Sequence, residues 1–217
     1  EIASCLVGSE MCIRDSLDDV LVNRLAVALD AVKGNSVIVL HQLGSHGPAY
    51  SARYPAAFER FKPACHTSQF ADCTREEIVN AYDNTIAYTD HILAEAIRLL
   101  DRHQELATNL FFVSDHGESL GENGLFLHGA PYFMAPDTQT HVPMIAWFSP
   151  SYAALVGLDQ GCVRNLADAP LSHDNVFHTM LGLSEVSTSA YQPALDMFAT
   201  CRGRAGGALA QLPEQRS

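Results

Sequence analysis

The sequence predicts an α/β fold with a mainly parallel central sheet flanked by helices. Short continuous apolar runs, typical of buried strands, alternate with segments of helical periodicity. Two of these runs lead directly into loops that contain histidine and glycine, and a long helical segment separates them. Because consecutive parallel strands need a long crossover, usually a helix, this order favours a parallel pair.

The composition is that of one globular domain. The chain has 217 residues, of which 47% are hydrophobic and 18% charged, and its formal net charge is -12. An acidic chain without a basic cluster argues against nucleic acid as a partner and against docking on anionic lipid through a broad positive face. No apolar run has the length of a membrane span. We expect a soluble segment, which can belong to a larger protein because it begins with Glu.

The first residues carry no structural signal. Residues 1–15 show no clean periodicity, and the string CLVGSEMCIRDS resembles a translated sequencing-adapter artefact. We therefore expect residues 1–15 to be non-native, so that Cys5 and Cys12 have no functional meaning. From Ser16, a plausible N-cap, apolar residues recur at helical spacing until Gly34 ends the helix.

A strand and a long helix follow. Residues 37–40 form a β-branched apolar run that leads into a loop containing His41 and His46. The long helix starts with a capping box, Thr74-x-x-Glu77, and runs to about residue 103. Its predicted buried stripe consists of apolar residues at helical spacing: Ile78, Tyr82, Ile86, Leu93, Ile97 and Leu100.

The stretch VSDHGESLGENGLFLHG is the main candidate for a site. It continues the predicted strand 110–113 into Asp115 and His116, at the strand end where α/β proteins bind ligands. A carboxylate and an imidazole suit zinc, or manganese when oxygen ligands dominate. A zinc site needs three or four ligands, so an isolated Asp-His-Gly would more often be a turn cap beside a hydrogen-bonding histidine.

The neighbouring residues favour the metal site over that alternative. His46 and His128 lie on glycine-flanked loops, and Glu118 lies near the Asp-His pair. If the strands are parallel, His46 and Asp115 lie at the same sheet edge. Several imidazoles there suit phosphoryl or sulfuryl transfer, where metal and histidine stabilise charge on the transferring oxygens.

The remaining chain completes one domain over residues 16–202. Residues 142–148 predict another strand, and Ser172-His173-Asp174 caps a short helix, residues 175–181, that Gly182 stops. From residue 203 the composition predicts a flexible tail. No internal repeat and no linker divides the chain.

The cysteines leave alternatives open. Cys65 and Cys73 flank a short polar loop, which is more easily explained by a disulfide in an oxidising compartment than by zinc, whose ligands usually lie two to four residues apart. For Cys162 and Cys201 the spacing does not decide between a disulfide and free thiols.

A serine nucleophile is the competing catalytic hypothesis. Neither Ser45 nor Ser114 lies in a G-x-S-x-G elbow, and Ser114 is too close in sequence to Asp115 and His116 to form a triad with them. The sequence also contains no P-loop, no G-x-G-x-x-G and no C-x-x-C.

Four segments carry a resemblance to a known family. VIVLHQLGSHGPAYSARYP, CTREEIVNAYDNTIAYTDHIL, FFVSDHGESLGENGLFLHGAPYFMAP and SHDNVFHTMLGL closely resemble the periplasmic domain of lipid A phosphoethanolamine transferases, in the alkaline phosphatase and sulfatase superfamily. The resemblance covers about residues 16–202. It implies a zinc-dependent enzyme of the bacterial inner membrane whose periplasmic domain moves phosphoethanolamine from phosphatidylethanolamine to a lipid A phosphate, through a phosphorylated threonine.

The resemblance also assigns roles to single residues. Asp115 and His116 match two of the four zinc-site residues. His46 and His128 match histidines that line the substrate site and can hold a further zinc, and we add His41 to the substrate-binding group. We expect His46, His128 and Glu118 to be the catalytic residues.

The family pattern is only partly present. Cys65 and Cys73 match one of its disulfides, whereas its nucleophilic threonine, a zinc-binding glutamate and the membrane domain belong upstream of residue 1. The chain is therefore expected to be a C-terminal part that is inactive alone. The competing hypotheses are a transferase of phosphoethanolamine or phosphoglycerol with another acceptor, a sulfatase, and a binding domain that has lost catalysis.

Overall fold

The computed structural model describes residues 3–6 and 17–203. The N-cap expected at Ser16, the thiol of Cys12 and the tail beyond residue 203 lie outside the described residues.

The chain forms two compact units, although the sequence predicts a single domain. It passes from one unit to the other after residues 102, 115 and 144, beside helices and strands, so no linker-like composition marks the division. Unit 1 comprises residues 1–102 and 116–144, and unit 2 comprises residues 103–115 and 145–217.

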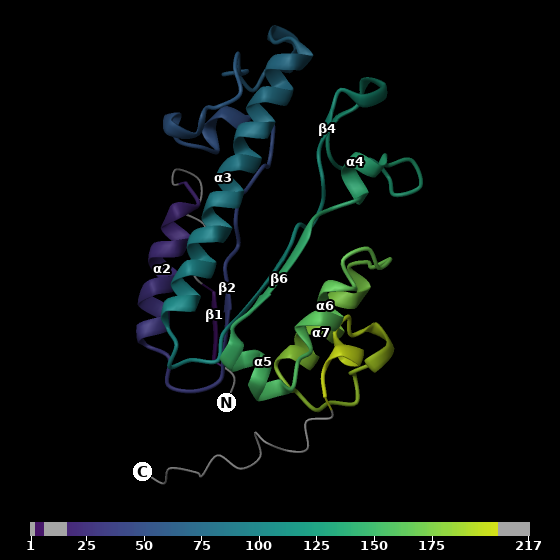
Figure 1. Cartoon of the computed structure of the whole chain (residues 1–217). Helices are drawn as coiled ribbons and strands as arrows, with labels where there is room; N and C mark the ends of the chain where they lie inside the picture. The colour runs from purple at the N-terminus through teal and green to yellow at the C-terminus, as the bar shows by residue number, and fades with distance from the viewer. Residues whose placement is uncertain (1–2, 7–16, 204–217) are drawn as a thin grey trace. The chain divides into compact units, whose positions relative to one another are not determined.

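Two helices dominate unit 1. The helices α2 (Asp19–Asp30) and α3 (Arg75–Arg102) lie side by side (Figure 1). Three apolar residues of α2, spaced four apart, are buried, as the helical spacing predicts: Leu21, Leu25 and Leu29. Gly34 was expected to end this helix, but the helix already ends at Asp30. Its last turn is tightened, because the carbonyl of Ala28 accepts the N–H of Ala31 and that of Leu29 accepts the N–H of Val32.

The predicted capping box at the start of α3 is confirmed. The N–H of Thr74 donates to Oε2 of Glu77 at 2.7 Å, and the N–H of Glu77 donates to Oγ1 of Thr74 at 3.2 Å. The two side chains thus satisfy donors that the helix leaves without an intrahelical partner.

This box gives the stability of the protein a pH dependence. The hydrogen bonds from the N–H and the hydroxyl of Thr74 lower the pKa of Glu77 from its ordinary value of 4.5. A carboxyl group with a lowered pKa in the folded state stabilises the fold above the unfolded pKa, and this contribution disappears as the pH falls through the folded pKa. We expect Glu77→Gln to lower the free energy of unfolding at neutral pH but not in acid, in urea titrations with Glu76→Gln as control. An equal loss at both pH values would contradict this reading.

The buried face of α3 includes only half of the predicted stripe. Ile78, Leu93 and Leu100 are buried as predicted, Tyr82 and Ile97 are half-buried, and Ile86 is 46% exposed. Besides the large apolar residues Ile92 and Leu99, the buried face includes small, polar and aromatic residues at helical spacing: Ala81, Asn84, Thr85, Tyr88 and Ala96. Ile86 follows Thr85 in the helix and therefore lies about 100° further around the helix axis, away from the buried face. A prediction based on apolar residues alone places Ile86 on the wrong face.

The strands of unit 1 are short. The strand β1 (Ala3–Leu6) pairs in parallel with β2 (Ser36–Val39), and β4 (Ser119–Leu120) pairs antiparallel with β5 (Phe126–Leu127). The sequence did not predict β1, and the non-native origin of residues 1–15 stays a prediction. A short helix, α4 (Asp137–Thr140), follows β5.

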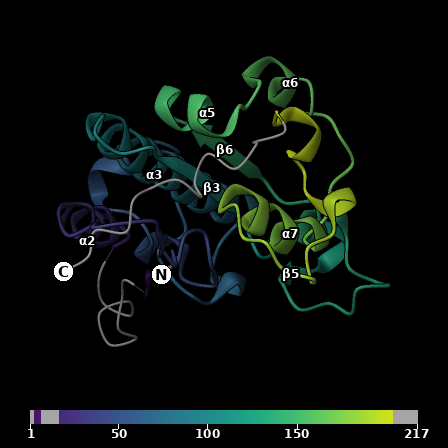
Figure 2. The same ribbon diagram turned by 90° about the horizontal axis from the view of Figure 1, so that it is seen from below.

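Unit 2 contains the other predicted strands. The strand β3 (Asn109–Val113) and β6 (Met144–Phe148) form a two-stranded sheet, and they lie beside each other in Figure 2. The helices of this unit are α5 (Pro150–Val156), α6 (Gln160–Arg164) and α7 (Asp174–Leu183). Single 3-10 turns complete the two units: Tyr50–Ala52, Ala56–Phe58, Phe70–Asp72, Glu122–Gly124, Pro193–Leu195 and Ala199–Cys201.

Gly182 does not stop α7, contrary to the sequence prediction. The helix continues through it to Leu183. A Cβ atom at Gly182 would lie 2.0 Å from Oδ2 of Asp196 and 2.4 Å from Nη2 of Arg202. The glycine therefore lies within the helix and makes room for the buried ion pair of Asp196 and Arg202 beside it.

Each unit contains one disulfide among its described residues. Cys65 pairs with Cys73, and Cys162 pairs with Cys201, which decides the alternative that the spacing had left open. The sulfur atoms of the first pair pack in the core cluster around Tyr50 and Ile78, at the start of α3. Both bonds are of the kind that persists in an oxidising compartment.

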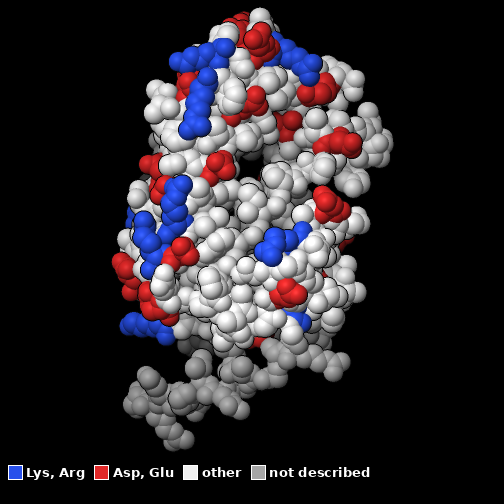
Figure 3. Space-filling model, viewed as in Figure 1, with Lys and Arg blue, Asp and Glu red and all other residues white. Residues whose placement is uncertain are grey.

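The surface combines both signs of charge. On the face in Figure 3, Lys and Arg side chains lie among Asp and Glu side chains. For example, Arg75 of α3 pairs with Glu122 at 3.0 Å, and Arg98 pairs with Glu95. Within residues 3–6 and 17–203, no helix has both the length and the apolar character needed to cross a membrane.

Candidate functional site

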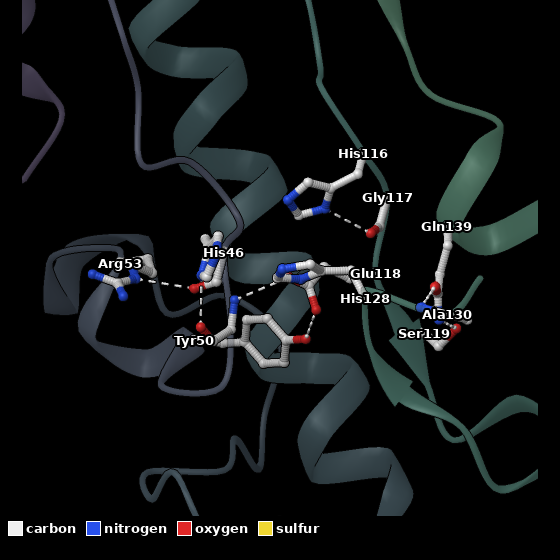
Figure 4. A network of polar contacts seen from close by, with 11 residues as sticks. His46, Tyr50, Arg53, His116, Gly117, Glu118, Ser119, His128, Ala130 and Gln139 are labelled. Atoms are coloured by element: carbon white, nitrogen blue, oxygen red, sulfur yellow. Dashed lines mark hydrogen bonds and ion pairs between the residues drawn. The ribbon is translucent and has the colours of Figure 1, made fainter. Parts of the chain in front are cut away.

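Three histidines from separate loops converge in unit 1. One ring nitrogen from each of His46, His116 and His128 lies within 4.8 Å of the others, as Figure 4 illustrates. The rings of His116 and His128 stack with centroids 3.9 Å apart, and the ring of His46 meets that of His128 edge-on at 4.9 Å. Among the described residues this is the cluster of histidine, cysteine and carboxylate side chains that is compact enough to hold a metal ion.

The loop after β2 is anchored where it carries His46. The buried carboxylate of Asp18 accepts hydrogen bonds from the N–H groups of Leu43 and Gly44, at 3.1 and 2.9 Å. On the other side, Nε of Arg53 donates to the carbonyl oxygen of His46 at 3.1 Å. The N-terminal end of α2 thereby fixes the main chain directly before His46.

The carboxylate of Glu118 links two of the histidine loops. It is buried, with 6% of the residue exposed. Its Oε1 accepts from the N–H of Gly47 at 3.2 Å and from Nδ1 of His128 at 3.0 Å, while Oε2 accepts from the hydroxyl of Tyr50 at 3.0 Å. Glu118 therefore ties the loop of His46 to the ring of His128 (Figure 4).

These contacts select the tautomer of each histidine. Nδ1 of His46 lies 2.7 Å from the carbonyl oxygen of Gly47, and Nδ1 of His116 lies 3.0 Å from that of Gly117. Because carbonyl and carboxylate oxygens only accept, Nδ1 carries the proton in all three rings, including His128 beside Glu118. In a neutral ring with its proton on Nδ1, Nε2 is the nitrogen that can bind a metal, as in histidine ligands whose other nitrogen is held by an acceptor.

A buried glutamine supports the opposite side of the site. Gln139 of α4 accepts the N–H of Gly117 at 2.9 Å through its main-chain carbonyl oxygen. Its side chain donates to Oγ of Ser119 at 2.9 Å and accepts the N–H of Ala130 at 3.3 Å. One residue thus connects the segment after His116 with the segment after His128.

The hydroxyl of Tyr50 stays a donor over the whole physiological pH range. Burial, followed by the nearby carboxylate of Glu118, strongly raises the pKa of Tyr50. The same two causes raise the pKa of Tyr82, whose ring meets that of Tyr50 edge-on. A protonated Tyr50 can therefore hold the Glu118 carboxylate in the orientation in which its Oε1 accepts from Nδ1 of His128.

The three imidazoles form a donor set that fits zinc. Zinc binds imidazole nitrogen at about 2.0–2.1 Å, which separates tetrahedral ligands by about 3.4 Å. The ring nitrogens, within 4.8 Å of one another, need only small movements to reach that spacing. The acceptors on Nδ1 supply the outer shell that zinc-binding histidines commonly have.

The structure unites some of the predicted site residues and leaves others apart. His46, His116, His128 and Glu118 come together. His41 is exposed and does not belong to the three-histidine cluster. Asp115 is exposed and ends the first segment of unit 2, so its role as a zinc ligand stays a prediction.

The sequence did not predict that Tyr50 and Gln139 belong to the site. Tyr50 lies three residues beyond Gly47 in a predicted loop, and Gln139 lies in a polar stretch, so neither has a periodic or motif signal. Their burial, 1% for Tyr50 and 6% for Gln139, is visible only in the folded chain.

Comparison with known proteins places this geometry in a family. The Sulfatase family model matches residues 8–186. The chain is 50% identical over 187 residues to a protein named phosphoethanolamine transferase EptA, from Salmonella typhimurium. The match covers 85% of this chain and 34% of that protein. The chain thus spans about a third of the length of this relative.

Solved structures show the same similarity. The soluble domain of lipooligosaccharide phosphoethanolamine transferase A from Neisseria meningitidis superimposes with a TM-score of 0.83 at 42% identity, over 86% of this chain and 57% of that one. A second structure, described as the integral membrane protein of that name, matches with the same TM-score of 0.83, over 86% of this chain and 35% of its own.

Proposed function

This chain belongs to the sulfatase family, and we propose that it is the C-terminal part of a transferase that moves phosphoethanolamine from phosphatidylethanolamine to a lipid A phosphate. The predicted fold class, an α/β fold like that of alkaline phosphatases and sulfatases, is confirmed by the family match and by the TM-score of 0.83. The proposed activity is supported by the names of the relatives and by the histidine cluster.

The observation that carries the proposal is the convergence of three imidazoles. One ring nitrogen from each of His46, His116 and His128 lies within 4.8 Å of the others, and an oxygen acceptor lies beside Nδ1 of each ring. Imidazole suits zinc, copper, iron and nickel, and a site of this kind on short loops is typical of zinc in hydrolytic and transfer enzymes. We infer that these three residues, with Asp115 as a further candidate, hold zinc.

The site offers chemistry that suits phosphoryl transfer. Bound zinc would stabilise negative charge on the oxygens of the transferring phosphoryl group. His46 and His128 are exposed, so a phosphoryl group can reach them. Glu118 orients His128 and, through Gly47, the loop of His46, so we infer that it acts as a positioning residue.

The proposal includes a location and two lipid partners. A phospholipid donor and a lipid A acceptor require the domain to work at a membrane, and we place it in the bacterial periplasm, attached to the inner membrane through another part of the enzyme. The two disulfides support this compartment, because the periplasm is oxidising.

Zinc titration of the purified chain tests the metal site. We expect weak binding by calorimetry, and a loss of about tenfold in affinity for His116→Ala and for His128→Ala, because each removes one ligand. His66→Ala is the matched control, since His66 pairs with Glu59 outside the cluster. Equal affinities for the wild type, the cluster variants and the control would sink the proposed site.

A transfer assay tests the proposed activity. We expect the 217-residue chain to transfer no phosphoethanolamine from a fluorescent donor, and a reading frame extended upstream to transfer it to lipid A. Transfer to a core sugar instead of lipid A would favour the alternative acceptor. Turnover by the chain alone that disappears in Asp115→Ala would refute the expectation that it is inactive.

A further inference from the structure

A short turn beside the site exposes three large apolar side chains in succession. Tyr132, Phe133 and Met134 are 88%, 85% and 65% exposed. We call residues 131–134 the apolar turn. The hydration of a contiguous exposed apolar surface is unfavourable, so such a surface often marks an interaction site.

The apolar turn is an ordered structure. The carbonyl oxygen of Pro131 accepts hydrogen bonds from the N–H groups of Met134 and Ala135, at 2.8 and 2.9 Å. Pro131 and Pro136 bracket the turn, and proline restricts the main chain. The exposed side chains are therefore presented by a defined backbone.

The base of the turn is connected to the histidine site. Gln139 accepts the N–H of Ala130, directly before the turn, and its own main-chain oxygen accepts the N–H of Gly117, directly after His116. On the other side, three residues separate His128 from Tyr132. Whatever surface receives the turn is consequently held beside the three histidines.

The charge pattern indicates what that surface is. Residues 125–136, LFLHGAPYFMAP, contain no Asp, Glu, Lys or Arg, in a chain whose net charge is -12. An uncharged segment avoids the repulsion that the rest of an acidic chain meets at a membrane. Tyrosine and phenylalanine are the side chains that suit the boundary between headgroups and acyl chains.

We propose that the apolar turn inserts into the surface of a phospholipid bilayer and holds the histidine site at the level of the headgroups. The inference rests on the proposed function, because that function needs a phospholipid donor to reach His46 and His128. It adds a membrane contact made by this domain itself, separate from any membrane-spanning segment.

Vesicle binding tests the proposal without zinc or turnover. The probe is a vesicle of phosphatidylethanolamine and phosphatidylcholine, with binding measured by co-sedimentation of the 217-residue chain. We expect the triple variant Tyr132→Ser, Phe133→Ser, Met134→Ser to lose about tenfold or more in the partition coefficient, because it removes three apolar side chains from the interface. The matched control is Val27→Ser, Ile86→Ser, Phe177→Ser, which removes apolar residues with 65%, 46% and 56% exposure elsewhere and should bind as the wild type does.

A fluorescent probe locates the contact. Phe133→Trp should shift its emission to the blue on vesicles and be quenched by brominated acyl chains, whereas Phe177→Trp should show neither effect. Circular dichroism of each variant verifies that it is folded, which is expected because the replaced side chains are exposed.

Several outcomes would overturn the proposal. They are a wild-type chain without affinity for the vesicles, a turn variant that binds as the wild type does, and a Phe133→Trp probe that stays in water. Self-association in sedimentation velocity that only the turn variant loses, without vesicle binding, would assign the turn to a second copy of the chain. A failed zinc titration with intact vesicle binding would count against the proposed function and leave this contact standing.

Discussion

Glu118→Ala is expected to lower zinc affinity about 10- to 100-fold and to destabilise the chain by about 3 kcal/mol. The carboxylate is buried and accepts from the N–H of Gly47, the hydroxyl of Tyr50 and Nδ1 of His128. Its removal leaves three polar groups without this acceptor and releases two of the three histidine loops. The effect on zinc should therefore exceed that of replacing one histidine.

Two controls separate positioning from general destabilisation. Tyr50→Phe removes one of the three hydrogen bonds to Glu118, so we expect a smaller loss in both zinc affinity and free energy of unfolding. Glu105→Ala removes an exposed carboxylate that pairs with His103, and both quantities should stay unchanged. A Glu118→Ala protein that binds zinc as tightly as the wild type in calorimetry would show that Glu118 does not position the site.

Gly117→Ala is expected to cost about 3 kcal/mol or more in the free energy of unfolding, measured by urea titration. A Cβ atom there would lie 2.1 Å from the carbonyl oxygen of Thr138 and 3.0 Å from its carbon. Both are main-chain atoms, so the backbone must shift, and the hydrogen bond from the N–H of Gly117 to Gln139 is lost with it. Because Gly117 lies between His116 and Glu118, zinc affinity should fall as well.

Gly34→Ala is the matched control for this substitution. A Cβ atom at Gly34 would meet nothing within 4 Å, and its φ lies outside the region that disfavours side chains. We expect a change within about 0.5 kcal/mol. Equal stabilities of the Gly117→Ala and Gly34→Ala proteins would mean that α4 and the loop after His116 can separate without cost.

The sequence was most informative where local forces decide the structure. The capping box at Thr74 and the apolar spacing of α2 act through neighbouring residues, and both were found in the structure. The predicted end of α7 was wrong, because Gly182 is required by the close approach of Asp196 and Arg202 and not by a helix end. Ile86 was misplaced for a related reason, since polar residues of α3 occupy the buried face that an apolar pattern does not show.

The candidate site shows the same division. The strand-to-loop pattern with histidine and glycine selects His46, His116 and His128 as candidates, and the structure brings their rings together. Tyr50 and Gln139 act through hydrogen bonds to residues far away in the sequence: Tyr50 to Glu118, and Gln139 to Ser119. No local pattern encodes such partners.

The sequence by itself determined the fold class and selected the three histidines as candidates for a phosphoryl-transfer site, because these depend on residue types and on their place after strands. The tertiary structure alone decided which nitrogen each histidine presents, that Glu118 is a buried acceptor rather than an exposed one, and that Cys162 pairs with Cys201. Those properties follow from which groups meet after folding. A proton on Nδ1 or a buried carboxylate is stabilised by a partner that only the folded chain brings within hydrogen-bonding distance.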